Sequence, residues 1–253
     1  MSKWVLKGLK TGKKTTLYPA VAETAAGVSP GLPEALPVAD SSDSLICPQG
    51  VFGEVGEETA ADVRRCVHCF NCVRSAETPA TWQAGYEWGR LAQADAKGRP
   101  GLGAPFSHSV HIRMVDAGAC DACVSEVRQI GKPYYNMHRL GFFITPSPRH
   151  ADVLLVVGPV TDNMEYPLKK AYEAMPTPKI VVAVGTCALT GCVFGPSYAS
   201  RGGVAEILPV DVEIPGCPPP PLAILHGLLV AVGRKPSAMD QAPGAAAPER
   251  STP

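Results

Sequence analysis

Nine cysteines are the residues of this 253-residue sequence most able to do chemistry, and they fall into two groups. The first group includes the stretch "CVHCFNC", in which Cys66, Cys69 and Cys72 follow a C-x2-C-x2-C pattern. Thiolates at this spacing can wrap one side of an iron–sulfur cluster, and the run is typical of bacterial ferredoxins. The fourth ligand of such a triplet is a distant cysteine followed by proline, which Cys47-Pro48 provides here. The pattern predicts one [4Fe–4S] cluster on these four cysteines.

The second group of cysteines depends on predicted strands. Apolar runs rich in Val, Leu and Ile predict strands at 111–116, 151–158, 179–185 and 205–214. Two of these runs are nearly continuous, as expected for strands buried on both faces. Helical patterns alternate with the strands, at 121–131, 163–175 and 218–232. This alternation indicates βαβ units, so the predicted fold class is α/β with a mainly parallel sheet.

Sites in such sheets form beyond the carboxyl ends of the strands. Cysteines follow three of the four predicted strands, at Cys120, Cys123, Cys187, Cys192 and Cys217. Neighbouring glycines let the backbone approach closely, and its N–H groups can hydrogen-bond to cluster sulfurs. Four thiolates that converge at one sheet edge would make a metal or cluster site.

Zinc is an alternative occupant of either set. It usually binds separated cysteine pairs, and the N-terminal triplet is crowded for a tetrahedral ion. A redox-active thiol pair at Cys120 and Cys123 is another alternative, although it leaves Cys187 and Cys217 unexplained.

Two further side chains lie close to these motifs. Cys192 is the odd ninth cysteine, and we interpret it as a packed free thiol near the second set. His68 lies inside the triplet and would replace a thiolate only if Cys47 cannot reach the others. We otherwise expect a solvated histidine.

Composition limits the class of protein. Apolar residues make up 45% and charged residues 18%, which excludes wholesale disorder. Basic and acidic residues balance at 23 each, which argues against nucleic acid as a partner. The apolar run at 222–232 is shorter than the roughly 20 residues of a membrane span. With no secretory pattern visible, we expect a cytosolic protein whose cysteines are not structural disulfides.

Changes of composition along the sequence predict four parts. They are an N-terminal extension with a small, irregular ferredoxin-like cluster segment (1–93), a linker (94–107), an α/β domain (108–235) and a disordered tail (236–253). Glycine and proline in the linker, and alanine and proline in the tail, are the basis for these two assignments. The first 22 residues carry five lysines and no acid, which suits a basic amphipathic segment or an ordinary solvated turn.

Four stretches then resemble one family, in order: "DAGACDACVSEV", "PSPRHADVLLVVGPVTDNM", "AYEAMPTPKIVVAVGTCALTG" and "LPVDVEIPGCPPPPLAILHGLL". Over about residues 108–234 the chain resembles the small, cluster-bearing subunit shared by respiratory complex I and the membrane-bound [NiFe] hydrogenases, including formate hydrogenlyase. Complex I members have adjacent cysteines in the first motif, so Cys120-x-x-Cys123 favours the hydrogenase branch. The start of the chain, "WVLKGLKTGKKTTLYP", resembles the ferredoxin-type subunit of the same complexes.

The resemblance implies a flavodoxin-like fold, with helices on both faces of the sheet. It also implies a [4Fe–4S] cluster on Cys120, Cys123, Cys187 and Cys217, which brings the expected cofactors to two [4Fe–4S] clusters. The implied partners are a large [NiFe]-hydrogenase-like (complex I 49 kDa-like) subunit, a ferredoxin-like subunit or other electron donor, and the membrane subunits of the complex. The implied location is peripheral, on the cytoplasmic side of the cell membrane.

Two positions carry more specific implications of the resemblance. The family has a glutamate matching Glu126, near the active site of the large subunit, and a carboxyl group there is a candidate proton relay. The family usually has glycine where this chain has Cys192.

The predicted function is that of an iron–sulfur electron-transfer subunit in a membrane-associated [NiFe] hydrogenase complex. Electrons would pass between the N-terminal cluster and a proximal cluster beside the large catalytic subunit. A complex I type subunit that passes electrons toward quinone is the alternative within the superfamily. A zinc-stabilised scaffold protein is the alternative from a different class.

Overall fold

The computed structural model describes residues 2–12, 14–23, 31–35, 47–52, 61–74, 80–92, 106 and 108–237. Its strands are β1 (Leu32–Ala35), β2 (Thr81–Gln83), β3 (Arg90–Leu91), β4 (Val110–Asp116), β5 (Phe142–Ile144), β6 (Val153–Val157), β7 (Val160–Thr161), β8 (Ile180–Val184), β9 (Ser200–Gly202) and β10 (Val212–Ile214). Its α-helices are α1 (Lys3–Thr11), α2 (Asn71–Arg74), α3 (Ala122–Gln129), α4 (Asp162–Ala174), α5 (Thr186–Thr190) and α6 (Pro221–Ala231). Short 3-10 helices cover Val63–Arg65, Met137–Leu140, Pro148–His150 and Val204–Glu206.

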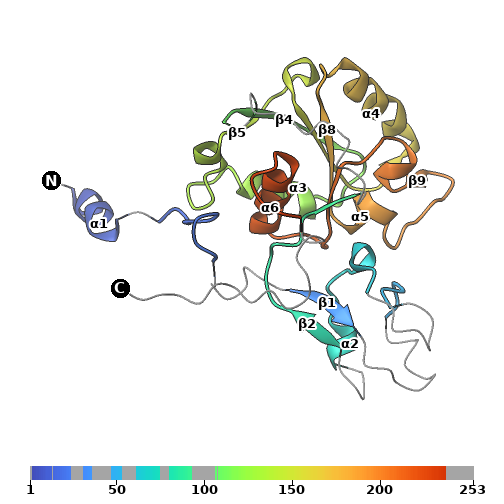
Figure 1. The fold of residues 1–253 in the computed structure, drawn as a ribbon, viewed down its shortest axis with the longest axis horizontal. Helices are drawn as coiled ribbons and strands as arrows, with labels where there is room; N and C mark the ends of the chain where they lie inside the picture. The colour runs from blue at the N-terminus through green and yellow to red at the C-terminus, as the bar shows by residue number, and fades with distance from the viewer. Residues whose placement is uncertain are drawn as a thin grey trace.

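The central sheet has six strands in the order β3-β10-β8-β6-β4-β5 (Figure 1). Strands β10, β8, β6, β4 and β5 are parallel, and only β3 runs antiparallel to its neighbour. Numbered along the chain, the five parallel strands have the order 2-1-3-4-5, which is the flavodoxin-like arrangement. The predicted α/β fold class with a mainly parallel sheet is therefore confirmed.

Helices cover both faces of this sheet because its central strands are apolar on both sides. Every residue of β6 and β8 is buried, and successive side chains enter two different cores. Leu155 and Val182 pair across the strands and face α3 and α6, whereas the pair Leu154 and Val181 faces α4 and α5. The segments that follow the carboxyl ends of β4, β8 and β10 carry Cys120, Cys187 and Cys217.

The predicted elements agree with most of this arrangement. Strands predicted at 111–116, 151–158 and 179–185 correspond to β4, β6 and β8, and the three predicted helices correspond to α3, α4 and α6. The predicted strand at 205–214 is wrong over its first half. Val204 and Leu208, four residues apart, are both buried in one core, and the Leu208 N–H donates to the Val204 carbonyl as in a helical turn. Only its last three residues, β10, join the sheet.

The N-terminal part of the chain packs directly on the α/β fold. Strand β3 pairs with β10, and Tyr18, Tyr86 and Trp88 belong to the same core cluster as α3 and α6. The indole N–H of Trp88 donates to the Pro215 carbonyl over 2.8 Å. The predicted linker, 94–107, and tail, 236–253, lie outside the described residues except for residues 106, 236 and 237.

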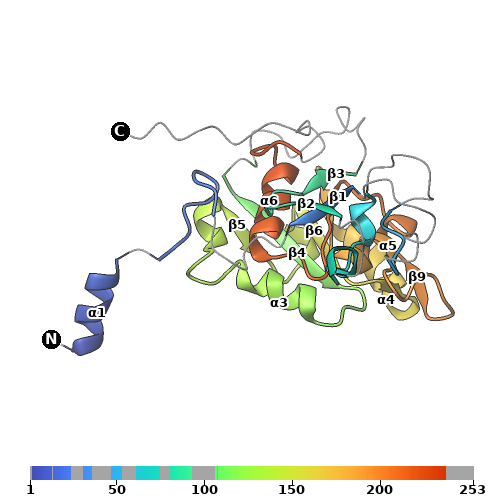
Figure 2. The same cartoon turned by 90° about the horizontal axis from the view of Figure 1, so that it is seen from below.

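The first helix, α1, stands apart from this body in both views (Figures 1 and 2). It has no buried residue, and the side chains of Trp4 and Leu9 are about three-quarters exposed. Among the residues that the structure describes, no helix has the length and apolar character needed to cross a membrane.

Candidate metal centres

The backbone of the triplet turns Cys66, Cys69 and Cys72 toward one space. His68 and Phe70 both have positive φ, at 53° and 58°, so the chain bends at alternate residues between the cysteines. Helix α2 then begins directly before Cys72 and carries it. The three cysteines of the C-x2-C-x2-C pattern therefore face the same space.

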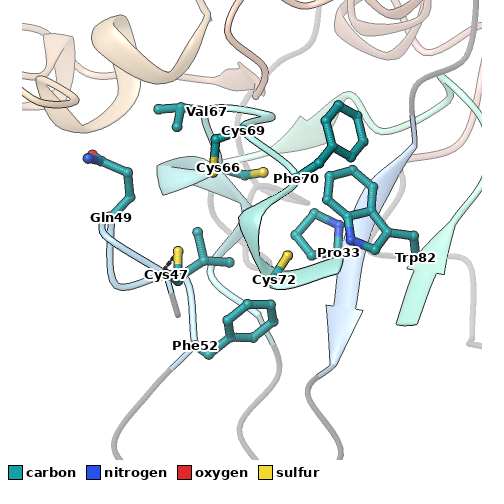
Figure 3. A pocket seen from close by; sticks show the side chains of 11 residues that line it. Pro33, Cys47, Gln49, Phe52, Cys66, Val67, Cys69, Phe70, Cys72 and Trp82 are labelled. Carbon is teal, nitrogen blue, oxygen red and sulfur yellow. Dashed lines mark hydrogen bonds between the residues drawn. The ribbon is translucent and has the colours of Figure 1, made fainter. Parts of the chain in front are cut away.

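Cys47 approaches the same space from a separate turn. The Gly50 N–H donates to the Cys47 carbonyl over 3.1 Å, and the Val51 N–H donates to Cys47 Sγ over 3.4 Å. The sulfurs of all four predicted ligands line one cavity (Figure 3). About 300 Å³ of this open cavity is not filled by atoms.

The walls of this cavity suit an iron–sulfur group. Most are apolar, with Phe52, Phe70 and Trp82 beside the cysteines. The indole N–H of Trp82 is buried and has no hydrogen-bond acceptor in the described structure. Burial raises the pKa of the Cys72 thiol, and the nearby indole N–H offsets part of that rise. A donor left without an acceptor beside four thiols fits a guest that presents sulfur atoms.

The thiols of this set are close enough to affect one another. Burial raises the pKa of Cys66 to about 11, and the charges of Cys47, Cys72 and Cys69 add to that rise. A bound metal would reverse this preference, since coordination deprotonates a thiol. The chemistry of four thiol donors around an open space therefore fits a [4Fe–4S] cluster.

The second set is positioned by the strand ends. Cys187 lies in α5 directly after β8, Cys217 follows β10, and Cys123 lies in the first turn of α3, which follows β4. Gly185 has φ 90°, and a Cβ at that position would lie 2.6 Å from Cys123 Sγ. Only glycine lets the end of β8 approach the sulfur of Cys123 so closely.

The five cysteines of this region are close enough to affect one another's pKa. Burial raises the pKa of Cys123 to about 12, and the charge of Cys120 adds to the rise. Cys192 lies close enough to Cys187 and Cys217 to raise the pKa of both thiols, while its own pKa is lowered. Cys192 thus lies beside two of the predicted ligands.

Neither set is compact in the manner of a single-ion site. Within the described ranges, no group of three or more His, Cys, Asp or Glu side chains is arranged to hold one metal ion. The fit to a cluster therefore comes from the four-thiol donor sets and, in the N-terminal set, from the cavity that the sulfurs share.

Glu126 lies one turn after Cys123 on α3 and is half-buried. Burial raises the pKa of its carboxyl group, and its charge in turn raises the pKa of Cys123. A raised carboxyl pKa brings proton exchange closer to neutral pH.

His68 differs from both earlier interpretations, as a ligand or as a solvated side chain. Its Nε2 bonds to the Gly31 carbonyl over 3.0 Å, and its Nδ1 accepts from the Cys217 N–H over 3.4 Å. Burial lowers the pKa of the ring. Both nitrogens are therefore in use, and nothing in the sequence pattern indicated the contact with Cys217.

Known proteins resemble this arrangement over about half of the chain. Formate hydrogenlyase subunit 7 of Escherichia coli is 40% identical over 146 residues, which are 54% of this chain and 57% of that protein. A probable membrane-bound hydrogenase subunit of Pyrococcus furiosus is 46% identical over 127 residues, 50% of this chain and 76% of that protein. A chain of a membrane-bound sulfane sulfur reductase, an archaeal respiratory complex, has a TM-score of 0.44 and 30% identity, and the match covers 50% of this chain and 73% of that one.

Together with the family match, the flavodoxin-like sheet with cysteines at its strand ends defines this chain as a subunit of an oxidoreductase. The chain belongs to the family of the NADH ubiquinone oxidoreductase 20 kDa subunit, whose model matches residues 120–231. This family binds iron–sulfur groups, and its members are subunits of hydrogenase and complex I oxidoreductase complexes. The chain spans little more than half the length of formate hydrogenlyase subunit 7.

Proposed function

We propose that this chain is an electron-transfer subunit of a membrane-associated [NiFe] hydrogenase complex. The observation that carries the proposal is that two four-cysteine sets lie in one body, with hydrogen bonds between the segments that carry them. The Thr186 hydroxyl donates to the Cys66 carbonyl over 2.9 Å, and the Cys217 N–H donates to His68. These contacts keep the two segments adjacent, as electron transfer between the sets would require.

In this proposal each set holds one [4Fe–4S] cluster. The N-terminal ligands are Cys47, Cys66, Cys69 and Cys72, and the proximal ligands are Cys120, Cys123, Cys187 and Cys217. When bound, such clusters accept and donate single electrons at potentials set by their surroundings. The protein supplies the thiols, the apolar walls and the buried N–H donors, while Cys192 remains outside the ligand sets.

The chemistry of substrate belongs to a partner in this proposal. We infer that a large [NiFe]-hydrogenase-like (complex I 49 kDa-like) subunit docks beside the second set, where Glu126 relays protons on its raised-pKa carboxyl group. A ferredoxin-like subunit or other donor would exchange electrons at the N-terminal set. Membrane subunits would hold the complex, with this chain peripheral on the cytoplasmic side.

The test is elemental analysis and EPR on the anaerobically purified full chain. We expect about eight iron per chain, little zinc and two reducible [4Fe–4S] signals. Stoichiometric zinc without iron would favour the scaffold alternative and contradict the proposal. Nickel in a complex purified through this chain would then separate the hydrogenase from a quinone-reducing relative.

A further inference from the structure

His68 connects the two cysteine sets although it belongs to only one of them. It lies between Cys66 and Cys69, yet its ring bonds to the backbone of Cys217, 149 residues further along the chain. The described structure gives this ring no part in lining the cavity that the N-terminal sulfurs share. Its placement therefore needs a reason other than ligation.

The two hydrogen bonds fix the state of the imidazole. The Gly31 carbonyl can only accept, so Nε2 carries the hydrogen. The Cys217 N–H can only donate, so Nδ1 presents its lone pair. The ring is held as one neutral tautomer that spans the distance between Gly31 and Cys217.

Aromatic neighbours hold the ring in place. The rings of Trp82, Trp88 and Phe70 have centroids 5.9, 6.0 and 6.3 Å from that of His68. Trp88 is itself anchored to the Pro215 carbonyl, two residues before Cys217. This packing surrounds the imidazole with aromatic side chains.

A second bond runs parallel to the first. Thr186, 1% exposed, donates its hydroxyl to the Cys66 carbonyl, and the next residue is Cys187. Each bond thus joins a residue at or beside a predicted ligand of one set to a residue at or beside a ligand of the other. Electrons move faster along covalent and hydrogen-bonded connections than across unbonded gaps.

We propose that His68 is the positioning residue that links the two sets for electron transfer, with Thr186 as the parallel connection. This inference rests on the proposed function. The step would move one electron from the cluster held by one set to the cluster held by the other, so one cluster would be oxidised by one electron and the other reduced by one. No bond forms or breaks, and no proton leaves the imidazole.

The decisive variants test the acceptor nitrogen of His68 separately from its aromatic ring. His68→Phe keeps an aromatic ring, and the neighbouring Phe70 shows that phenylalanine tolerates this backbone conformation. His68→Asn loses the ring but places an amide oxygen near the position of Nδ1, and asparagine readily adopts positive φ. Asparagine therefore serves as the matched rescue of the bond to Cys217.

The measurement is the transfer rate between the sets in the full, iron-loaded chain. A photochemical one-electron reductant delivers less than one electron per chain, and rapid-freeze EPR follows its redistribution. We expect His68→Phe to slow transfer by about tenfold or more, and His68→Asn to stay close to wild type. The magnetic interaction between the two reduced clusters should not change, which shows that the distance between them is preserved. Wild-type transfer in His68→Phe would overturn the proposal.

A measurement that does not follow electron transfer checks the same hydrogen bond. Amide hydrogen exchange at Cys217 should become about fivefold faster in His68→Phe, as expected when one hydrogen bond is lost, and not in His68→Asn. Unchanged exchange in His68→Phe would also overturn the proposal.

The parallel connection provides a second pair of variants if His68→Phe fails to hold iron. Thr186→Val removes the hydroxyl at nearly constant shape, and Thr186→Ser keeps it. Slower electron transfer in Thr186→Val but not in Thr186→Ser supports the linkage, and equal rates in the two variants contradict it. Failure of the proposed function is distinct from these outcomes, because it appears as missing iron in the wild-type chain before any rate is measured.

Discussion

The two cysteine sets are built by different means. The N-terminal set depends on local turns: a triplet bent at His68 and Phe70, and a separate turn that carries Cys47. The second set depends on topology, because β4, β8 and β10 end at the same edge of a parallel sheet. A local motif can lose its metal and leave its surroundings folded, whereas a site at strand ends shares the stability of the whole sheet.

The largest effect should come from breaking the local set alone. Cys66→Ser should remove about four iron and leave the other four in place, because the sheet that positions the second set does not depend on the triplet. The bond from Thr186 survives, since its acceptor is the backbone carbonyl of residue 66. Iron analysis and EPR spin counting check this. Simultaneous loss of both signals would show that the sets are not independent.

The next test concerns the proton relay that we propose for Glu126, beside the second set. Glu126→Gln should lower hydrogen turnover of the assembled complex by ~10²–10⁴, because glutamine keeps the shape but cannot exchange a proton. Both EPR signals and assembly with the partner should be unchanged. Near-normal turnover with intact clusters would reduce Glu126 to a surface residue, and a dissociated partner would make its role structural.

The contact between the two regions can be weakened at Glu213. This carboxylate on β10 is 9% exposed and pairs with Arg90 of β3 over 2.9 Å, with Arg64 a further 4.0 Å contact. Glu213→Ala leaves a guanidinium without its partner, and we expect Tm to fall by about 6–12 °C, equivalent to about 3 kcal/mol. Glu173→Ala, at the exposed pair with Lys170, is the control and should hardly change Tm. Equal shifts in the two variants would contradict a buried role for the Glu213 pair.

A smaller effect should follow pH at the same contact. Burial lowers the pKa of His226 to about 4, and its Nδ1 accepts from the Gly89 N–H. Nearby Glu87 favours the charged ring and Lys235 disfavours it. The neutral ring therefore contributes stability that is complete above pH 6.5 and is lost as pH falls toward 4, by at most about 3 kcal/mol.

Thermal unfolding between pH 7.5 and 4.5 measures this contribution. His226→Asn should be less stable at neutral pH but show a shallower decline between pH 6.5 and 4.5. Parallel curves for the two proteins would assign the decline to other groups.

The smallest expected change tests whether Cys192 belongs to the ligands of the second set. Cys192→Ala should keep about eight iron per chain, since eight other cysteines already satisfy two four-ligand sites. The contact of Cys192 with Cys187 and Cys217 makes this a demanding test. Loss of about four iron would make Cys192 a ligand and one of the eight assignments wrong.

Sequence patterns predicted the parts of the fold that are long and periodic. Continuous apolar runs located β6 and β8, and an apolar stripe located α4, because burial on one or both faces leaves a direct trace in residue order. They missed α5, which has five residues between two glycines, and β3, whose two residues form a strand only by pairing with β10. The ligand assignments remain predictions.

The candidate sites show the same limit. The spacing of the triplet was readable because its geometry is local, and cysteines after strands were readable because parallel strands end together. The orientation of the His68 ring was not, because its partner is 149 residues away. The same holds for the contact of Cys192 with Cys217, which depends on how two loops fold back.

The pairing of β3 with β10 has a consequence for synthesis of the chain. The N-terminal cysteines leave the ribosome first, but the strand beside β3 and the amide that bonds to His68 are made more than a hundred residues later. The early segment must therefore wait, undocked, until the last strand of the sheet has been translated. A factor that delivers iron to the first four cysteines during translation would meet an open segment, and one that acts after release would meet a segment already docked against the sheet.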